Sequence, residues 1–121
     1  MAKILVAEDD ESMRGYIAHT LEADGHEVVT AGDGAQALEA LKEQDDFDLL
    51  FTDIVMPEMD GIELSGQAHR LYPNLKILYV SGFVGASLGG DEASAAMKII
   101  SKPFNLKDLV KQVRETLAQN T

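Results

Sequence analysis

Short, dense apolar runs alternate with longer stretches of helical periodicity along this chain. Runs this short and this apolar are typical of strands that are buried on both faces. They occupy residues 4–7, 28–29, 47–51, 77–80 and 97–100. Outside them, apolar residues recur at intervals of three and four, which predicts helices with one apolar face. The clearest such stripe extends over residues 106–117 and includes Leu109 and Val113.

Strand and helix are therefore expected to follow one another as five βα units. Strict alternation implies a parallel sheet with right-handed crossovers and with helices on both faces. A length of 121 residues fits one domain and leaves little room for a second. We expect an α/β fold with a five-stranded, doubly wound (βα)5 sheet, in a single domain over residues 1–121.

Local signals support several of these helices and weaken one. Asp33 and Asn105 each precede a helical stretch and have a polar residue three positions later, as N-caps often do. Gly25 fits the end of the first helix. Residues 81–90, however, contain four glycines, and each glycine inside a helix costs about 1 kcal/mol relative to alanine. We predict a short, frayed or displaced fourth helix.

Charge and composition exclude several classes of function. The chain has 21 acidic and 10 basic residues, a formal net charge of −11. This balance disfavours binding to nucleic acid or to an anionic membrane through a basic face. No apolar run approaches the roughly 18 residues of a membrane span. There is no cysteine, so a disulfide or a thiolate metal site is impossible, which suits a cytoplasmic protein.

Polar and charged side chains follow four of the five predicted strands. The acidic run Glu-Asp-Asp at residues 8–10 comes after the first strand, and Asp53 ends the third. Ser81 ends the fourth strand, and Lys102 follows the fifth. The carboxyl ends of parallel strands meet at one edge of the sheet, where ligands bind near the point at which strand order reverses. These groups are therefore expected to converge.

Such a set of groups suits phosphoryl transfer. Clustered carboxylates repel one another unless a cation lies between them, and Mg²⁺ takes one or two carboxylates together with phosphate oxygens. A carboxylate can attack phosphorus to form an aspartyl phosphate, and a lysine and a hydroxyl stabilise the charge on the phosphoryl group. Each residue alone has an ordinary explanation, and Asp10 is a candidate cap for a helix that begins near Glu11. The set of polar groups at four strand ends has no such ordinary explanation.

The sequence resembles a bacterial response-regulator receiver domain of the two-component type along its whole length. The resemblance rests on the acidic pair after the first strand, on residues 53–61 (Asp-Ile-Val-Met-Pro-Glu-Met-Asp-Gly), on Ser81-Gly82 and on Lys102-Pro103. It implies the flavodoxin-like strand order 2-1-3-4-5. It also implies a phosphorylation-dependent signalling switch whose only catalysis is its own phosphorylation and dephosphorylation.

The resemblance further implies a phosphoacceptor and a metal site. Asp53 would accept the phosphoryl group. Mg²⁺ would bind Glu8, Asp9 and Asp53, with Asp9 the more direct of the first two. The backbone carbonyl of Val55 would complete the protein ligands. A register shifted by one residue, to Asp9 and Asp10, stays open.

The resemblance implies a phosphate-stabilising pair as well, and one departure from the family. Ser81 and Lys102 would contact the phosphate, and the bond before Pro103 would be cis, as in the family. The aromatic switch residue of the family is replaced here by Ile99, so the rotation of a ring cannot carry the signal. The glycine-rich segment after Ser81 is also unusual and occupies the face that receivers commonly use for output, so we expect activation to order or move residues 82–96.

The family also implies the partners. The phosphoryl donor would be a histidine kinase or a histidine phosphotransfer protein. Over residues 8–14, 52–64 and 101–109 the chain resembles single-domain receivers of alphaproteobacteria in particular. This likeness implies a monomer or weak dimer without a DNA-binding or enzymatic output domain. It also implies an adaptor whose phosphorylation gates the delivery of substrates to an ATP-dependent protease.

Two other functions share part of this pattern. Aspartyl-phosphate phosphatases and phosphotransferases of the haloacid-dehalogenase type carry a second aspartate two positions after the nucleophile, where this chain has Val55. A flavodoxin-like electron carrier would share the topology, but the carboxylates after the first strand would repel a flavin phosphate. His19, His26 and His69 are interpreted as structural or surface residues, because their spacing does not indicate a second phosphorelay site.

Overall fold

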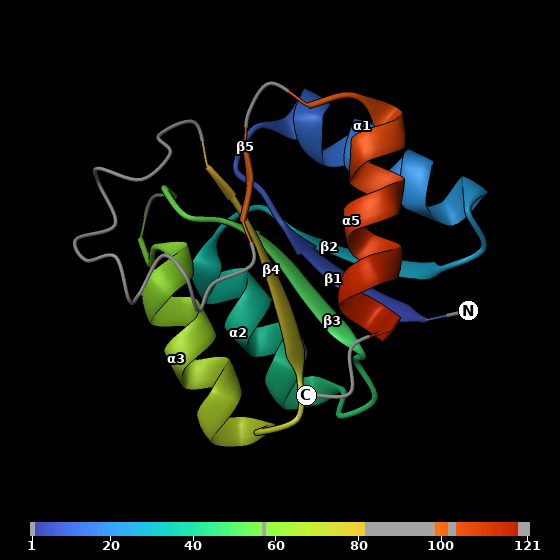
Figure 1. The fold of residues 1–121 in the computed structure, drawn as a ribbon. Coiled ribbons are helices and arrows are strands. Elements are labelled where there is room, and N and C mark those ends of the chain that lie inside the picture. The colour runs from blue at the N-terminus through green and yellow to red at the C-terminus, as the bar shows by residue number, and fades with distance from the viewer. Residues whose placement is uncertain (1, 57, 82–98, 102–103, 119–121) are drawn as a thin grey trace.

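The computed structural model describes residues 2–56, 58–81, 99–101 and 104–118, which form five strands and four helices (Figure 1). None of the helices in these ranges is both long and apolar enough to span a bilayer. In chain order the elements are β1 (Lys3–Ala7), α1 (Glu11–Ala23), β2 (Glu27–Ala31), α2 (Gly34–Glu43), β3 (Leu49–Asp53), α3 (Gly61–Leu71), β4 (Lys76–Ser81), β5 (Ile99–Ser101) and α5 (Leu106–Ala118).

The strands form one parallel sheet in the order β2-β1-β3-β4-β5. This confirms the predicted doubly wound sheet and its flavodoxin-like strand order. Asp53 stands opposite Val80 in the register, and Ser81 stands opposite Ser101. The central strands therefore end at nearly the same level. The order reverses between β1 and β3, so the carboxyl ends of these two strands flank the crevice where ligands bind in such sheets.

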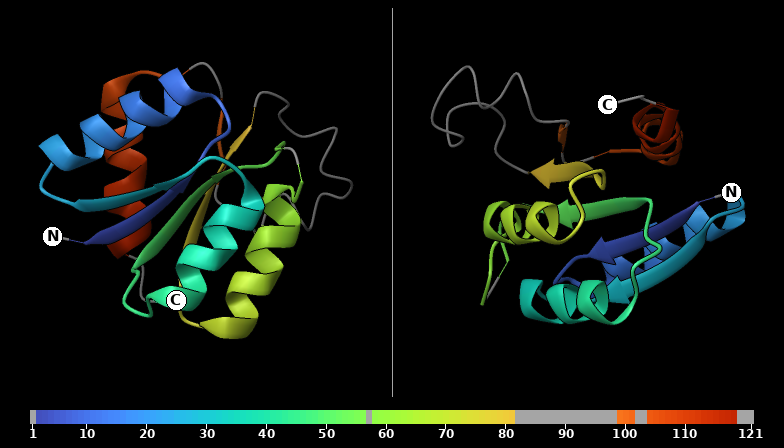
Figure 2. Two further views of the ribbon diagram at one scale, coloured as in Figure 1. Left: turned by 180° about the vertical axis from the view of Figure 1, so that it is seen from behind. Right: turned by 90° about the horizontal axis from the view of Figure 1, so that it is seen from below.

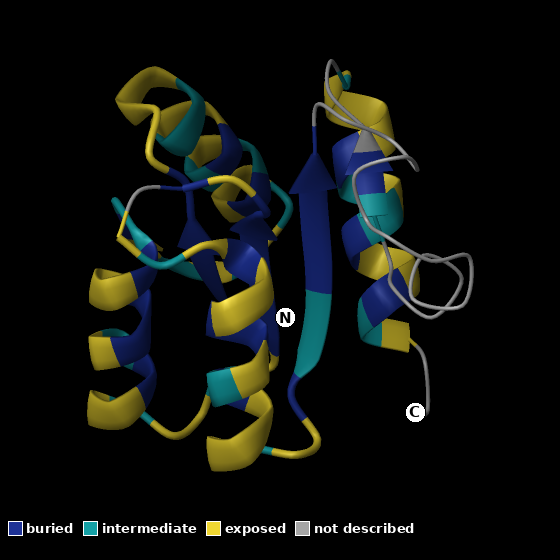
Figure 3. Ribbon diagram, turned by 90° about the vertical axis from the view of Figure 1, so that its left-hand side faces the viewer, coloured by how far each residue is buried: buried dark blue, intermediate teal, exposed yellow. Residues whose placement is uncertain are grey.

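Helices cover both faces of the sheet, with α1 and α5 on one side and α2 and α3 on the other (Figure 2). Side chains along β1 alternate between the two cores. Ile4 and Val6 pack toward α1 and α5, whereas Leu5 and Ala7 pack toward α2 and α3. All five residues of β3 are buried, whereas the helices expose one side to solvent (Figure 3). Burial on both faces is the reason why the strands are continuous apolar runs in the sequence.

Short polar side chains begin the helices. Asp10, Asp33 and Asp60 each accept a hydrogen bond from the backbone N–H three residues later, at 3.1, 2.8 and 2.8 Å. Asn105 does the same before α5, at 2.8 Å. Each bond satisfies one N–H that the helix itself leaves without a partner. Gly25 follows α1 with φ of 96°, the left-handed conformation typical of a residue after a helix.

Some strand boundaries differ from the sequence prediction. Five residues of β2, and not only its two valines, pair with β1. β3 begins at Leu49, after Phe47 and Asp48; the Asp48 N–H donates to the Lys3 carbonyl at 2.8 Å, and the Asp48 carboxylate accepts from the Lys3 N–H at 2.9 Å. β5 begins at Ile99. Residues 82–98, with the predicted irregular fourth helix, lie outside the described residues.

Candidate functional site

Three carboxylates converge where β1 and β3 end. Glu8 directly follows β1, Asp9 comes next, and Asp53 is the last residue of β3. One carboxylate oxygen of each residue lies within 4.8 Å of the other two. Glu8 is only 2% exposed and Asp53 only 6%, whereas Asp9 is exposed. The strand ends thus bring together three of the residues that the sequence singled out.

Hydrogen bonds hold the acidic run after β1 in place. The Glu8 N–H donates to the Ala31 carbonyl at 3.1 Å, which extends the pairing with β2 by one residue. Arg14 Nη1 donates to the Glu8 carbonyl at 2.9 Å, and the Asp10 N–H donates to Glu8 Oε2 at 3.0 Å. The Asp10 carboxylate itself caps α1. This geometry favours the register in which Glu8 and Asp9, rather than Asp9 and Asp10, face Asp53.

The residues before and after Asp53 form hydrogen bonds that hold the end of β3. The Val55 N–H donates to Asp53 Oδ1 at 3.3 Å, and Thr52 Oγ1 donates to the Asp53 carbonyl at 2.9 Å. The Ile54 N–H donates to the Val80 carbonyl at 3.0 Å, so the pairing with β4 continues one residue past Asp53. These bonds restrict the positions that the carboxylate can take.

Helix α3 places its first residue directly against the backbone of Asp53. The Gly61 N–H donates to the Ile54 carbonyl at 2.7 Å. A Cβ atom on Gly61 would lie 2.2 Å from the carbonyl oxygen of Asp53 and 3.0 Å from the Cα of Ile54. Only glycine allows backbone to approach this closely. The sequence did not predict this role for Gly61 or the contact made by Arg14, and the one signal for Gly61 was its place directly after the cap residue Asp60.

The structure also describes three other predicted site residues. Ser81 ends β4 and is 2% exposed. The Val55 side chain is 63% exposed, so the loop after β3 turns this residue toward solvent. Ile99 begins β5, is partly buried and stands opposite Tyr79 in the register. Outside the described residues lie Lys102, Pro103 and the segment 82–96.

The donor set of the cluster fits a hard divalent cation. Glu8 and Asp53 are withdrawn from water, which strengthens the repulsion among the carboxylates. A divalent cation relieves that repulsion, and Mg²⁺ prefers oxygen ligands of this kind. The set contains neither the imidazole nor the thiolate that zinc commonly takes. The chemistry of these residues therefore suits Mg²⁺ and a phosphate group.

Comparison with known proteins identifies the family. Residues 4–114 match the response regulator receiver domain. This chain belongs to the response regulator receiver family. The receiver is 47% identical over 118 residues to the response regulator receiver protein CpdR of Brucella abortus (strain 2308), and the match covers 97% of this chain and 98% of that protein. It is also 34% identical to the sensor kinase CckA of the same organism, over 96% of this chain but only 12% of the kinase.

A solved structure adds a relative with a ligand of the expected kind. The receiver resembles the response regulator protein TrrA of Thermotoga maritima, solved in complex with Mg²⁺-BeF, with a TM-score of 0.83 and 28% sequence identity. The match covers 96% of this chain and 99% of that one. The chain is thus a receiver that acts as a phosphorylation-dependent signalling switch. Neither the family match nor these relatives support the phosphatase alternative.

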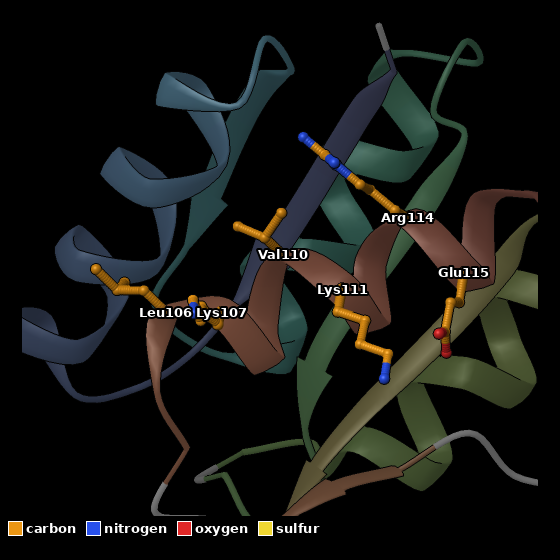
Figure 4. A pocket seen from close by; sticks show the side chains of 6 residues that line it. All are labelled: Leu106, Lys107, Val110, Lys111, Arg114 and Glu115. Carbon is orange, nitrogen blue, oxygen red and sulfur yellow. The ribbon is translucent and has the colours of Figure 1, made fainter.

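A surface hollow elsewhere on the receiver contributes nothing to this site. It has a volume of 460 Å³ and lies on α5 (Figure 4). No residue of the carboxylate cluster is among its lining residues, which are Leu106, Lys107, Val110, Lys111, Arg114 and Glu115.

The histidines also stand apart from the carboxylates. His19 and His69 are exposed on α1 and α3. His26 Nδ1 accepts a hydrogen bond from the Ala2 N–H at 3.1 Å, which joins the turn before β2 to the start of β1. None of the three belongs to the carboxylate cluster.

Proposed function

We propose that Asp53 accepts a phosphoryl group from a phosphohistidine donor. The observation that carries the proposal is the meeting of Glu8, Asp9 and Asp53 within 4.8 Å at the ends of β1 and β3. A carboxylate oxygen of Asp53 would attack phosphorus in line with the leaving imidazole nitrogen. The P–N bond breaks, the acyl phosphate O–P bond forms, and the released imidazole keeps the electron pair of the broken bond.

The contribution of the chain to this transfer is largely positioning. The Val55 N–H bond to Asp53 Oδ1 orients the carboxylate, and the contact with Gly61 holds the backbone beneath it. A nucleophile that is held in a reactive geometry gains rate, because the cost of ordering it was met when the protein folded.

We propose that Glu8, Asp9 and Asp53 hold Mg²⁺, together with the backbone carbonyl of Val55. When bound, the ion would offset the charge of the carboxylates and of the phosphoryl group. The proposal is supported by the oxygen donors of the cluster and by the Mg²⁺-BeF complex of the Thermotoga maritima relative. Asp9→Asn should weaken Mg²⁺ binding at least tenfold in a titration, whereas Asp10→Asn, which keeps the helix cap, should not. Weakening of Mg²⁺ binding by Asp10→Asn as well as by Asp9→Asn would favour the register of Asp9 and Asp10.

Ser81 and Lys102 are proposed to stabilise the phosphoryl group. Ser81 ends the strand next to Asp53, and Lys102 directly follows β5 in the sequence. A hydroxyl and an ammonium at the strand edge would offset the charge that spreads over the phosphoryl oxygens. Removal of the Ser81 hydroxyl by Ser81→Ala should slow phosphoryl uptake and loss without preventing either.

The proposed partners follow from the family. A histidine kinase or histidine phosphotransfer protein would donate the phosphoryl group, and the receiver segment shared with the sensor kinase CckA supports a link to this chemistry. We propose a single-domain receiver, because CpdR matches over 98% of its own length. Its output would then be contact with another cytoplasmic protein, and the likeness to single-domain receivers makes an ATP-dependent protease the candidate.

One pair of variants tests the phosphoacceptor. The wild type, Asp53→Asn and Asp33→Asn are incubated with acetyl phosphate and Mg²⁺, and acid-labile phosphate is measured. Asp53→Asn should take up none. Asp33→Asn, which makes the same change of charge and retains a helix-capping side chain, should match the wild type. Acid-labile phosphate on Asp53→Asn at the wild-type level would refute the assignment.

A further inference from the structure

A buried hydrogen-bonded pair joins β4 to α3 close to the proposed phosphorylation site. Tyr79 on β4 is 8% exposed, and Ser65 on α3 is 5% exposed. The Tyr79 hydroxyl donates to Ser65 Oγ at 2.7 Å, and Ser65 Oγ donates to the Ile62 carbonyl at 2.9 Å. Burial raises the pKa of Tyr79 above its ordinary value, so its hydroxyl keeps its proton and remains a donor at neutral pH.

Both ends of this pair lead to residues of the site. On the helix side, Ile62 is the neighbour of Gly61, whose backbone packs against the Asp53 carbonyl. On the strand side, Tyr79 lies two residues before Ser81, and the alternation of β-strand side chains puts the two on the same face of the sheet. The pair therefore connects the helix that packs on Asp53 with the strand that carries Ser81.

We propose that the Tyr79–Ser65 hydrogen bond is a positioning element, which sets the spacing between Asp53 and Ser81 and thereby the rates of phosphoryl uptake and loss. The inference rests on the proposed role of Asp53 as phosphoacceptor. Without the bond, the first turn of α3 can shift against β4, and the reacting groups lose part of their alignment. Both rates should fall, while the apparent affinity for the phosphoryl donor should not change.

A purely structural bond would lower stability without changing these rates, and the receiver contains a control of that kind. Tyr72 follows α3, and its hydroxyl donates to the Leu41 carbonyl of α2. That contact lies at the end of α3 away from Gly61 and Asp53. Tyr72→Phe and Tyr79→Phe thus each remove a tyrosine hydroxyl that donates a hydrogen bond, but the Tyr72 contact is part-buried and lies farther from Gly61 along the chain.

The test measures rates on the full chain, well below its unfolding temperature. Uptake from acetyl phosphate with Mg²⁺ and the subsequent loss of phosphate are followed for the wild type, Tyr79→Phe, Ser65→Ala, the double variant and Tyr72→Phe. Loss of one hydrogen bond predicts maximal rates that are about two- to tenfold lower in Tyr79→Phe and Ser65→Ala. The double variant should be no slower than Ser65→Ala, because Ser65→Ala already lacks the bond to Tyr79.

Two further readings separate positioning from stability. The acetyl phosphate concentration at half-maximal rate should be the same in all variants, and Tyr72→Phe should keep the wild-type rates. Wild-type rates in Tyr79→Phe and Ser65→Ala, or equal slowing in Tyr72→Phe, would overturn the inference. If Tyr79→Phe does not fold, Ser65→Ala removes the same bond from the other side and decides the question.

The outcome also distinguishes the two proposals. If the wild type takes up phosphate on a residue other than Asp53, the proposed function fails and the inference fails with it. If Asp53 is labelled normally and the Tyr79 and Ser65 variants have wild-type rates, only the positioning role is wrong.

Discussion

The contact between Gly61 and the backbone of Asp53 predicts a large effect from one added methyl group. In Gly61→Ala the new Cβ would start 2.2 Å from the Asp53 carbonyl oxygen, whereas real Cβ atoms stay beyond 3.0 Å, so helix or strand must recede by about 0.8 Å. Neither the helix nor the strand can move easily. The Ile54 N–H donates a hydrogen bond to the Val80 carbonyl, and the Gly61 N–H donates one to the Ile54 carbonyl. The overlap should lower the free energy of unfolding by about 1–3 kcal/mol. Alanine offsets about 0.4–1 kcal/mol of this loss, because it reduces the conformational entropy of the unfolded chain.

The same displacement should also slow the chemistry. A misplacement of about 1 Å at a reacting group can cost roughly 100-fold in rate, so we expect uptake of phosphate from acetyl phosphate to fall about 10- to 100-fold. Urea unfolding measures the loss of stability, and the uptake of acid-labile phosphate measures the loss of rate.

Gly66→Ala is the matched control for this prediction. Gly66 lies on the same helix and is exposed, and a Cβ atom added to it would meet no neighbouring group of the described residues within 4 Å. Replacing glycine with alanine there should stabilise the receiver by about 0.5–1 kcal/mol and leave phosphate uptake unchanged. If Gly61→Ala were as stable and as active as Gly66→Ala, the close approach of α3 to Asp53 would be wrong.

Three further predictions concern stability. Asp10→Ala should lower the free energy of unfolding by about 1 kcal/mol, whereas Asp10→Asn should preserve the cap of α1, and urea unfolding that finds both equal would contradict the capping role. Leu50→Ala should cost about 2–5 kcal/mol in the same assay because Leu50 is fully buried in the core toward α2 and α3, and a cost under 1 kcal/mol would contradict that packing. The hydrogen bond from the Arg114 guanidinium holds the pKa of Asp24 below its ordinary 3.8. The wild type should therefore have a higher free energy of unfolding than Asp24→Asn at pH 7, and this difference should disappear as the pH falls below 3.8. A difference that does not depend on pH would refute the pairing of Asp24 with Arg114.

The site could be predicted from the sequence where short-range pattern decides the outcome. Asp53 was found because it ends an apolar run that is buried on both faces, and Glu8 because it directly follows another such run. Once alternation implies a parallel sheet, the ends of its strands meet at one edge, and their polar residues meet with them. The cap formed by Asp33 is similarly local, because the donor lies three residues away.

Other contacts left no such pattern. Arg14 reaches the Glu8 carbonyl from the first turn of α1, six residues away, but an arginine on a helix usually faces solvent. Tyr79 and Ser65 are 14 residues apart and belong to a strand and a helix. Before the packing of α3 is known, Tyr79 is one more residue of an apolar run. The bond between the Asp48 carboxylate and the Lys3 N–H likewise joins residues that are 45 positions apart.

The most direct test of the account is to locate the phosphoryl group chemically. The receiver is incubated with acetyl phosphate and Mg²⁺ and then treated with borohydride, which reduces an acyl phosphate to an alcohol and so converts a phosphorylated aspartate into homoserine. Peptide mass spectrometry should find homoserine at position 53 and at no other aspartate. Homoserine at another position, or phosphate that resists borohydride, would contradict the assignment of Asp53 as the phosphoacceptor.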